Sequence, residues 1–199
     1  AAEDPYDIFV AFVINKKYGK IENWDTSRVT DMTELFKGFE NFNKDISNWD
    51  VSNVINMNGM FSRARKFNQD ISNWKVDNVT NMASMFRLAK AFNQDISQWN
   101  VSKVENMEFM FNKSRFNQNI SKWNVQPNTN VDRMFNSTPL AESVFGYDKP
   151  TEVEIMKYFT GTLESDVPTL TQTPIPLDGV PGLPPVILGD GVDAPDDIY

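Results

Sequence analysis

Three aspartates that recur at one position of a repeating pattern are the best candidates for chemistry in this chain. Asp45, Asp70 and Asp95 lie 25 residues apart, and Asn119 continues the series. The chain has no histidine and no cysteine, which removes the commonest general base, the Ser–His and Cys–His pairs and the usual zinc ligands. Carboxylates stacked about 5 Å apart could still hold a calcium ion, because oxygen ligands suit calcium.

A structural role for these aspartates is the alternative, and it is the interpretation that we favour. Asp and Asn side chains commonly fasten turns by accepting hydrogen bonds from nearby backbone N–H groups. Each copy of the pattern offers one carboxylate, whereas calcium-binding repeats combine several with glycines. We therefore expect no catalytic residue, no cofactor and no metal site, and we expect the chain not to be an enzyme.

A second polar row lies close to the aspartates. Asn43, Asn68, Asn93 and Asn117 each follow a phenylalanine, namely Phe42, Phe67, Phe92 and Phe116. Stacked asparagine amides can form a ladder between repeats. A strip of Asn, Gln and aromatic side chains that binds carbohydrate is the alternative. The glycosylation sequons at Asn78, Asn112, Asn119 and Asn136 would matter only in a eukaryotic secretory route.

The elements that position these residues repeat about every 25 residues. The five tryptophans Trp24, Trp49, Trp74, Trp99 and Trp123 keep this spacing, with isoleucines three residues before the last four and phenylalanines twelve residues after all five. So short a repeat cannot bury its own apolar edge, and its stability must come from stacked neighbours. Eight of the nine methionines share the phenylalanine face, which indicates core filling in preference to a methionine-rich binding surface.

Each repeat shows two hydrophobic spacings. Ile46, Trp49, Val51 and Val54 have the spacing of a leucine-rich-repeat strand, and Val54, Met57, Met60 and Phe61 have helical spacing after a possible N-cap at Ser52 or Asn53. The predicted fold class is α/β, a leucine-rich-repeat-like solenoid of about five 25-residue coils with helical caps and an extended C-terminal tail.

Four segments follow from this pattern. We predict an N-terminal cap helix in residues 1–20, the repeat solenoid in 21–137, a C-terminal helical cap in 138–161 and an extended acidic, Pro-rich tail in 162–199. The first helix is expected over 5–18, with Pro5 near its start and Gly19 after its end. A membrane-surface or partner helix is the alternative there. Short helices are expected over 138–147 and 151–160, separated by Pro150.

The tail differs in charge from the rest of the chain. Of the net charge of −8, residues 162–199 carry seven acids and no lysine or arginine, which leaves 20 acids and 19 bases elsewhere. A nearly neutral body argues against nucleic-acid binding. Seven prolines favour an extended tail. The predicted partner-binding residues are its apolar side chains Leu170, Ile175, Leu177, Val180, Leu183, Val186, Ile187, Leu188, Ile198 and Tyr199.

Location and partners follow only in outline. The first residues, AAEDPYD, suggest a processed chain that is secreted, surface-exposed, in the lumen of an organelle or part of a virion. The sequence contains no apolar run of 18 residues, so we predict no integral membrane segment. The acidic tail predicts other protein subunits with basic patches as partners.

The segment FNQDISNWKVDNVTNMASMF, residues 67–86, resembles the bacterial surface protein repeats known as BspA-like, which are abundant in mycoplasma-type surface lipoproteins and occur in some algae and large viruses. The shared motif F-N-x-D-I-S-x-W-x-V-S-x-V-x-x-M-x-x-M-F covers residues 21–136. The resemblance implies a leucine-rich-repeat-like solenoid that acts in binding on surfaces, with no catalytic residue to transfer.

The function that we expect is a non-enzymatic protein–protein interaction or structural module. The leading hypothesis is an accessory subunit docked on a larger assembly through its tail. The alternative is a free cell-surface adhesin that binds host protein or glycan through the solenoid face.

Overall fold

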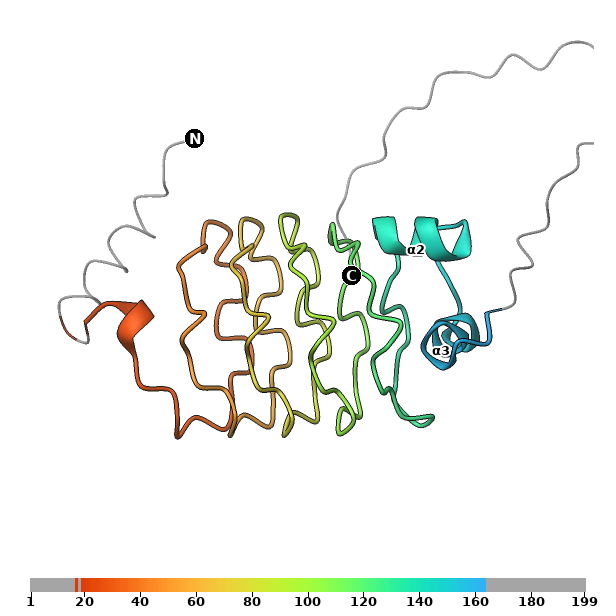
Figure 1. Cartoon of the computed structure of the whole chain (residues 1–199). Coiled ribbons are helices and arrows are strands. Elements are labelled where there is room, and N and C mark those ends of the chain that lie inside the picture. The colour runs from red at the N-terminus through yellow and green to blue at the C-terminus, as the bar shows by residue number, and fades with distance from the viewer. Residues whose placement is uncertain (1–16, 18, 164–199) are drawn as a thin grey trace, which may run out of the picture. The chain divides into compact units, whose positions relative to one another are not determined.

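A computed structural model describes residue 17 and residues 19–163 (Figure 1). The chain divides into two compact units, residues 1–167 and 168–199, and all the described residues belong to the first. The helix predicted over 5–18 lies outside the described residues except for Lys17, and the tail lies outside from residue 164 onward. None of the described helices is long and apolar enough to cross a membrane.

The predicted α/β class, a leucine-rich-repeat-like solenoid of about five coils with helical caps, is wrong. The described residues contain no strand, and their helices are a 3-10 helix at Ile21–Asn23 (η1) and two α-helices at Pro139–Phe145 (α2) and Glu152–Thr160 (α3). Between η1 and α2 the chain is made of turns and irregular backbone. Parallel pairing there is limited to the isolated bridges Asp31–Asn56, Asn56–Asn81, Asn81–Asn106 and Asn106–Asn130.

Backbone hydrogen bonds explain why the methionine–phenylalanine segment is not helical. The Met60 N–H donates to the Met57 carbonyl at 3.2 Å, within one tight turn. The N–H groups of Met57 and Gly59 instead donate to the carbonyls of Asn81 and Ala83 in the next repeat, both at 2.8 Å. An α-helix needs bonds four residues back along its own segment. Along this segment, some N–H groups bond within their own turn and others bond to the neighbouring repeat.

Two residues per repeat have left-handed backbone, which also excludes a continuous helix. Gly59 has φ 62° and Arg63 has φ 62°, and the equivalent positions in the other repeats are alike. The full set is Glu34, Gly38, Gly59, Arg63, Ser84, Leu88, Phe109, Lys113, Arg133 and Ser137. A right-handed helix cannot contain such residues. Because only two of them are glycines, the turns were hidden in the sequence.

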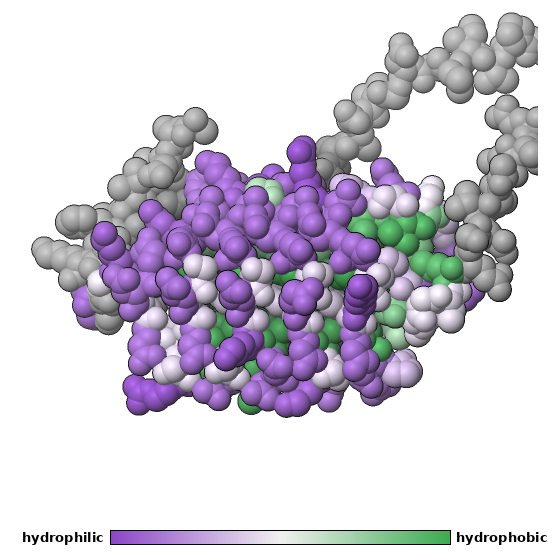
Figure 2. All heavy atoms as spheres, in the orientation of Figure 1, coloured by the Kyte–Doolittle hydropathy of each residue, from purple (hydrophilic) through white to green (hydrophobic). Residues whose placement is uncertain are grey.

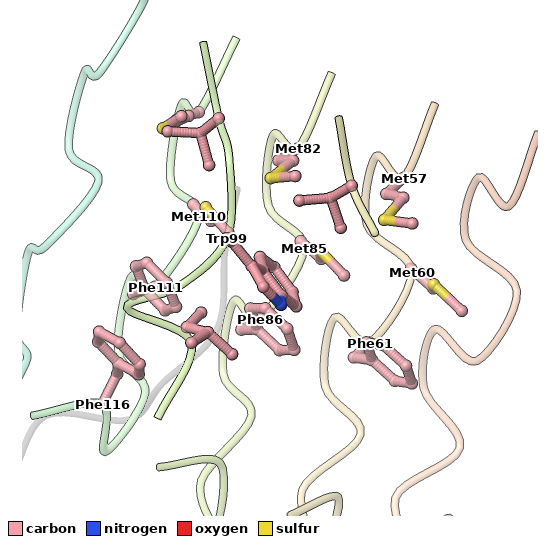
Figure 3. Packing of buried hydrophobic residues seen from close by; sticks show 14 of the residues in the cluster. Met57, Met60, Phe61, Met82, Met85, Phe86, Trp99, Met110, Phe111 and Phe116 are labelled. Atoms are coloured by element: carbon pink, nitrogen blue, oxygen red, sulfur yellow. The ribbon is translucent and has the colours of Figure 1, made fainter. Parts of the chain in front are cut away.

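Successive repeats lie side by side and bury their apolar rows against one another (Figures 1 and 3). We call residues 21–137 the repeat stack, and we call equivalent residues of successive repeats a row. The rings of Phe61 and Phe86 stack with centroids 5.6 Å apart, and those of Phe86 and Phe111 follow at 5.7 Å. Met57 and Met60 are completely buried. The prediction that the methionines fill the core is confirmed.

The tryptophan row links repeats through both ring and backbone. The Trp74 indole Nε1–H donates to the Ile46 carbonyl of the preceding repeat at 3.2 Å, and the Trp99 indole donates to Ile71 at 3.1 Å. A buried indole N–H requires an acceptor. The bond ties each of the last four tryptophans to the backbone of the preceding repeat. The isoleucine side chains three residues before these tryptophans are themselves fully buried in the core.

Two short helices follow the last repeat, as the sequence predicts for 138–147 and 151–160. Thr138 caps α2, and Thr151 forms a capping box with Glu154 at the start of α3. Both helices end at a left-handed glycine. Phe159 of α3 stacks on Trp123 with ring centroids 6.4 Å apart, which extends the tryptophan row.

Candidate functional site

The row of aspartates fastens turns, as the favoured interpretation predicts. Oδ1 of Asp45 accepts the Ser47 N–H at 3.0 Å and the Ser47 hydroxyl at 2.7 Å. Asp70 and Asp95 each accept the N–H of the serine two residues on at 2.9 Å. Asn119 does the same for Ser121 at 3.0 Å, so an amide serves as well as a carboxylate. The geometry needs an acceptor oxygen at this position and does not need a charge.

These hydrogen bonds also set the acidity of the row. The Ser47 hydroxyl and N–H hold the pKa of Asp45 below its ordinary value of 3.8. The Ser72 N–H does the same for the pKa of Asp70, and the nearby Asp45 charge opposes it slightly. An exposed carboxylate with a lowered pKa is a weak general base at neutral pH. No group of three or more acidic side chains placed to hold a metal ion occurs among the described residues.

The asparagine row forms the predicted ladder, with backbone groups as the donors. Oδ1 of Asn43 accepts the Asn68 N–H at 2.9 Å, and Oδ1 of Asn68 accepts the Asn93 N–H at 2.9 Å. The Asn117 N–H completes the series by donating to Asn93 at 2.8 Å. Gln94 adds a bond from its side-chain amide to the Asn68 carbonyl at 2.8 Å. The row therefore connects each repeat to the next.

The carbohydrate strip lacks the aromatic surface that it was predicted to have. Phe67, Phe92 and Phe116 have no exposed surface, and Phe42 is only partly exposed. Their rings stack inside the core, so a sugar cannot reach their faces. The sequon residue Asn112 is likewise buried, with 7% of its surface exposed. The Asn and Gln side chains remain as a polar row without an aromatic platform.

Open grooves lie beside two of the tryptophans. One is lined by Trp49 with Asn73 and Lys75 of the next repeat. The other lies at the equivalent place beside Trp99, with Lys122 of the next repeat in its lining. Both tryptophans are almost fully buried, so the grooves present polar walls. Figure 2 shows that hydrophilic side chains cover most of the visible face of the repeat stack.

Counting net charge over the whole body missed a concentration of basic side chains. When the repeats are aligned on their phenylalanines, residues 63–66, 87–90 and 113–115 occupy the same corner of successive repeats. The sequence shows this concentration as the basic run Arg63-Ala64-Arg65-Lys66, and residues 87–90 and 113–115 carry two basic residues each. An alignment by repeat period would have found it.

The predicted partner-binding residues, from Leu170 to Tyr199, all lie outside the described residues. Their role in binding therefore stays a prediction.

Comparison with known proteins gives one match. The family model described as "Mycoplasma protein of unknown function, DUF285" matches residues 7–115 and again residues 79–167. The two overlapping matches cover well over half of the chain and support the predicted internal repeats. No curated protein and no solved structure matches the chain.

Proposed function

We propose that this chain, which belongs to the DUF285 family of Mycoplasma proteins of unknown function, is a non-enzymatic protein–protein interaction or structural module. One observation carries the proposal. The carboxylates best placed for chemistry each accept hydrogen bonds from a serine of their own turn, and an asparagine replaces them in the last repeat. Residues that serve a turn in this way need no substrate to explain them.

The module acts as an accessory subunit that docks on a larger assembly through residues 162–199. Seven acids without a basic residue, together with apolar side chains, suit a partner that has basic patches around an apolar groove. Prolines restrict the free chain, so less conformational entropy is lost on docking. The tail then attaches the repeat stack, as a rigid body, to the larger assembly.

The test compares three forms of the chain in extracts of cells that make it. The full chain should migrate in native size separation as part of a larger species. A form ending at Leu163 should migrate as the free chain, with its tryptophan fluorescence unchanged. A full-length form with the seven tail acids changed to Asn or Gln should bind the assembly more weakly, and its binding should respond less to salt. Equal assembly of all three forms would contradict docking through the tail.

The alternative is an adhesin that binds through the exposed face of the repeats. The regular polar rows and the equivalent grooves beside Trp49 and Trp99 favour it. The resemblance of residues 67–86 to BspA-like repeats supports a location at the cell surface. The form ending at Leu163 discriminates the two functions, because an adhesin of this kind keeps its binding without the tail.

A further inference from the structure

One corner of the repeat stack concentrates positive charge in three successive repeats. The segments 61–69, 86–94 and 111–118 contain seven of the chain's 19 basic residues and no acidic residue. These basic residues are Arg63, Arg65, Lys66, Arg87, Lys90, Lys113 and Arg115. We call them the basic edge. A concentration of this size is unexpected in a body whose acids and bases nearly balance.

Backbone hydrogen bonds hold the three segments next to one another. The Arg63 N–H donates to the Arg87 carbonyl at 2.8 Å, and the Leu88 N–H donates to the Asn112 carbonyl at 2.9 Å. Such bonds place neighbouring chains about 4.8 Å apart. The charges of the basic edge therefore form a linear array that runs from repeat to repeat.

A buried residue in each segment turns the basic side chains outward. Ala64 and Ala89 have no exposed surface, and Ser114 is 4% exposed. The residues on either side of Ala64, Arg63 and Arg65, are both exposed. Anchoring the middle of each corner in the core leaves its charged neighbours on the solvent side.

An acidic side chain contacts the basic edge at its N-terminal end. Glu40 of the first repeat forms an ion pair with Arg65 at 3.0 Å, and both side chains are more than half exposed. An exposed pair such as Glu40–Arg65 is weak and is readily replaced by a better ligand.

An aromatic ring fixes one guanidinium of the basic edge. The Arg87 guanidinium lies over the Phe109 ring at 5.5 Å, and Arg133 lies over the same ring at 5.3 Å. Cation–π contact orients an arginine without neutralising it. Nε of Arg87 is buried and has no hydrogen-bond partner. The ring therefore fixes the position of the guanidinium, while the buried Nε itself is out of reach of a ligand.

We propose that the basic edge binds a linear sulfated polysaccharide. Arginine and lysine match sulfate through charge-assisted hydrogen bonds, and a linear array of cations matches a polymer with anionic groups along its length. Asn68 and Gln69 follow two and three residues after Lys66. Oδ1 of Asn68 already accepts the Asn93 N–H, so the Asn68 side chain offers its amide N–H groups to sugar hydroxyls. Nucleic acid is disfavoured because the phenylalanines beside the asparagine row are buried and give bases nothing to stack on.

The test uses the full chain and heparin fragments of defined length as the probe. The test variant carries Arg63→Ser, Lys66→Ala and Lys113→Ser. Each substitution introduces a residue that occupies the same row elsewhere, since Ser137 is equivalent to Arg63 and Lys113, and Ala91 is equivalent to Lys66. The control variant loses three charges from other rows through Lys75→Asn, Lys103→Asn and Lys122→Asn. Asparagines also occur in these three rows.

The expected result is a Kd for heparin that rises at least about tenfold in the test variant and less than about twofold in the control. The slope of log Kd against log salt concentration should fall by about two to three in the test variant. Each lost contact means that about one counterion fewer is released on binding. Equal losses in both variants would show attraction by net charge alone and overturn the site. Tighter binding to single-stranded DNA or anionic vesicles, or undiminished binding to desulfated heparin, would overturn the ligand class. Matching urea midpoints exclude misfolding as the cause.

Discussion

The first repeat and the middle repeats have the same sequence pattern but differ in burial at several equivalent positions. Leu35 in the first repeat is 41% exposed, whereas Met60, its equivalent in the second, is 0% exposed. Phe39 is 40% exposed, and its equivalent Ala64 is 0% exposed. The difference is not in the residues, because the exposed members are at least as apolar as the buried ones. Among the described residues, the first repeat has a neighbouring repeat on one side, whereas each middle repeat has one on both sides and buries more of these positions.

Hydrogen bonds within a single repeat do not show this difference. Asp45 accepts the Ser47 N–H at 3.0 Å near the start of the stack, and Asp95 accepts the Ser97 N–H at 2.9 Å in the middle. The molecule therefore combines interactions that depend on neighbouring repeats with interactions that do not. Substitutions at equivalent positions separate the two kinds.

The largest difference is expected in the tryptophan row. Trp74→Ala removes a ring that is 4% exposed and packs against Phe61, so unfolding should become easier by about 3–5 kcal/mol. Trp24→Ala removes a partly exposed ring that, among the described residues, stacks on Trp49 of the second repeat, and it should cost about 1–2 kcal/mol. Urea unfolding followed by circular dichroism measures both. Equal midpoints for the two variants would mean that neighbours do not decide burial.

The repeat period and the buried rows could be predicted from the sequence because apolar side chains recur in register. Every methionine of the repeats is buried, from Met32 to Met134. The backbone could not be predicted in the same way. The spacing of Met57, Met60 and Phe61 fits a helix, yet the N–H groups of Met57 and Phe61 bond to the next repeat. Such bonds exist only after stacking, so no local pattern reports them.

The left-handed turns provide the next test. Gly59→Ala keeps φ 62° strained and brings the new Cβ to 3.2 Å from Cγ of Glu34 in the first repeat, so stability should fall by about 1–2 kcal/mol. Ser84→Gly, the converse change in the next repeat at φ 55°, should raise stability. Thermal melting measures both changes. Adding Glu34→Ala to Gly59→Ala should recover only the part of the lost stability that comes from the close approach of the new Cβ to Glu34. Complete recovery would show that the backbone is not strained there.

The asparagine ladder should show a smaller effect of position. Asn93→Ala removes the acceptor of the Asn117 N–H in the middle of the stack and should cost about 1 kcal/mol. Asn93→Asp keeps an acceptor oxygen, so it should retain most of the stability that Asn93→Ala loses. Asn43→Ala removes the equivalent bond between the first two repeats. Hydrogen exchange should then increase mainly in residues 21–45. Faster exchange throughout the stack after Asn43→Ala would mean that the first repeat does not open by itself.

The candidate site shows the same division between local and non-local signals. The role of Asp45, Asp70 and Asp95 could be predicted because an Asx turn involves only residues two apart. The burial of Phe67 and Phe92 beneath the asparagine row removes the carbohydrate strip, and it depends on how successive repeats stack. The basic edge also depends on stacking, because its three segments begin 25 residues apart in sequence.

Acid should weaken the aspartate turns equally at both places. The pKa of Asp45 and of Asp95 is lowered by hydrogen bonds from serine, so each carboxylate contributes stability above its ordinary pKa of 3.8 and loses it as the pH falls through the lowered value. Asp45→Asn and Asp95→Asn should each remove the same small part of the stability change between about pH 5 and pH 2. Thermal melting against pH measures it. A larger effect at Asp95 would make this bond depend on neighbouring repeats.

Calcium is expected to give no shift, which makes it the strictest test of the local interactions. An ion held between repeats would have to bridge Asp70 to Asp45 and Asp95, and it would therefore stabilise the middle of the stack. Each carboxylate already accepts hydrogen bonds within its own turn, and Asn119 ends the series without a charge. Melting with a chelator and with millimolar calcium should thus give the same midpoint, for the native chain and for Asp70→Asn alike. A rise with calcium that disappears in Asp70→Asn would restore the ion ladder and make the aspartate row dependent on neighbouring repeats.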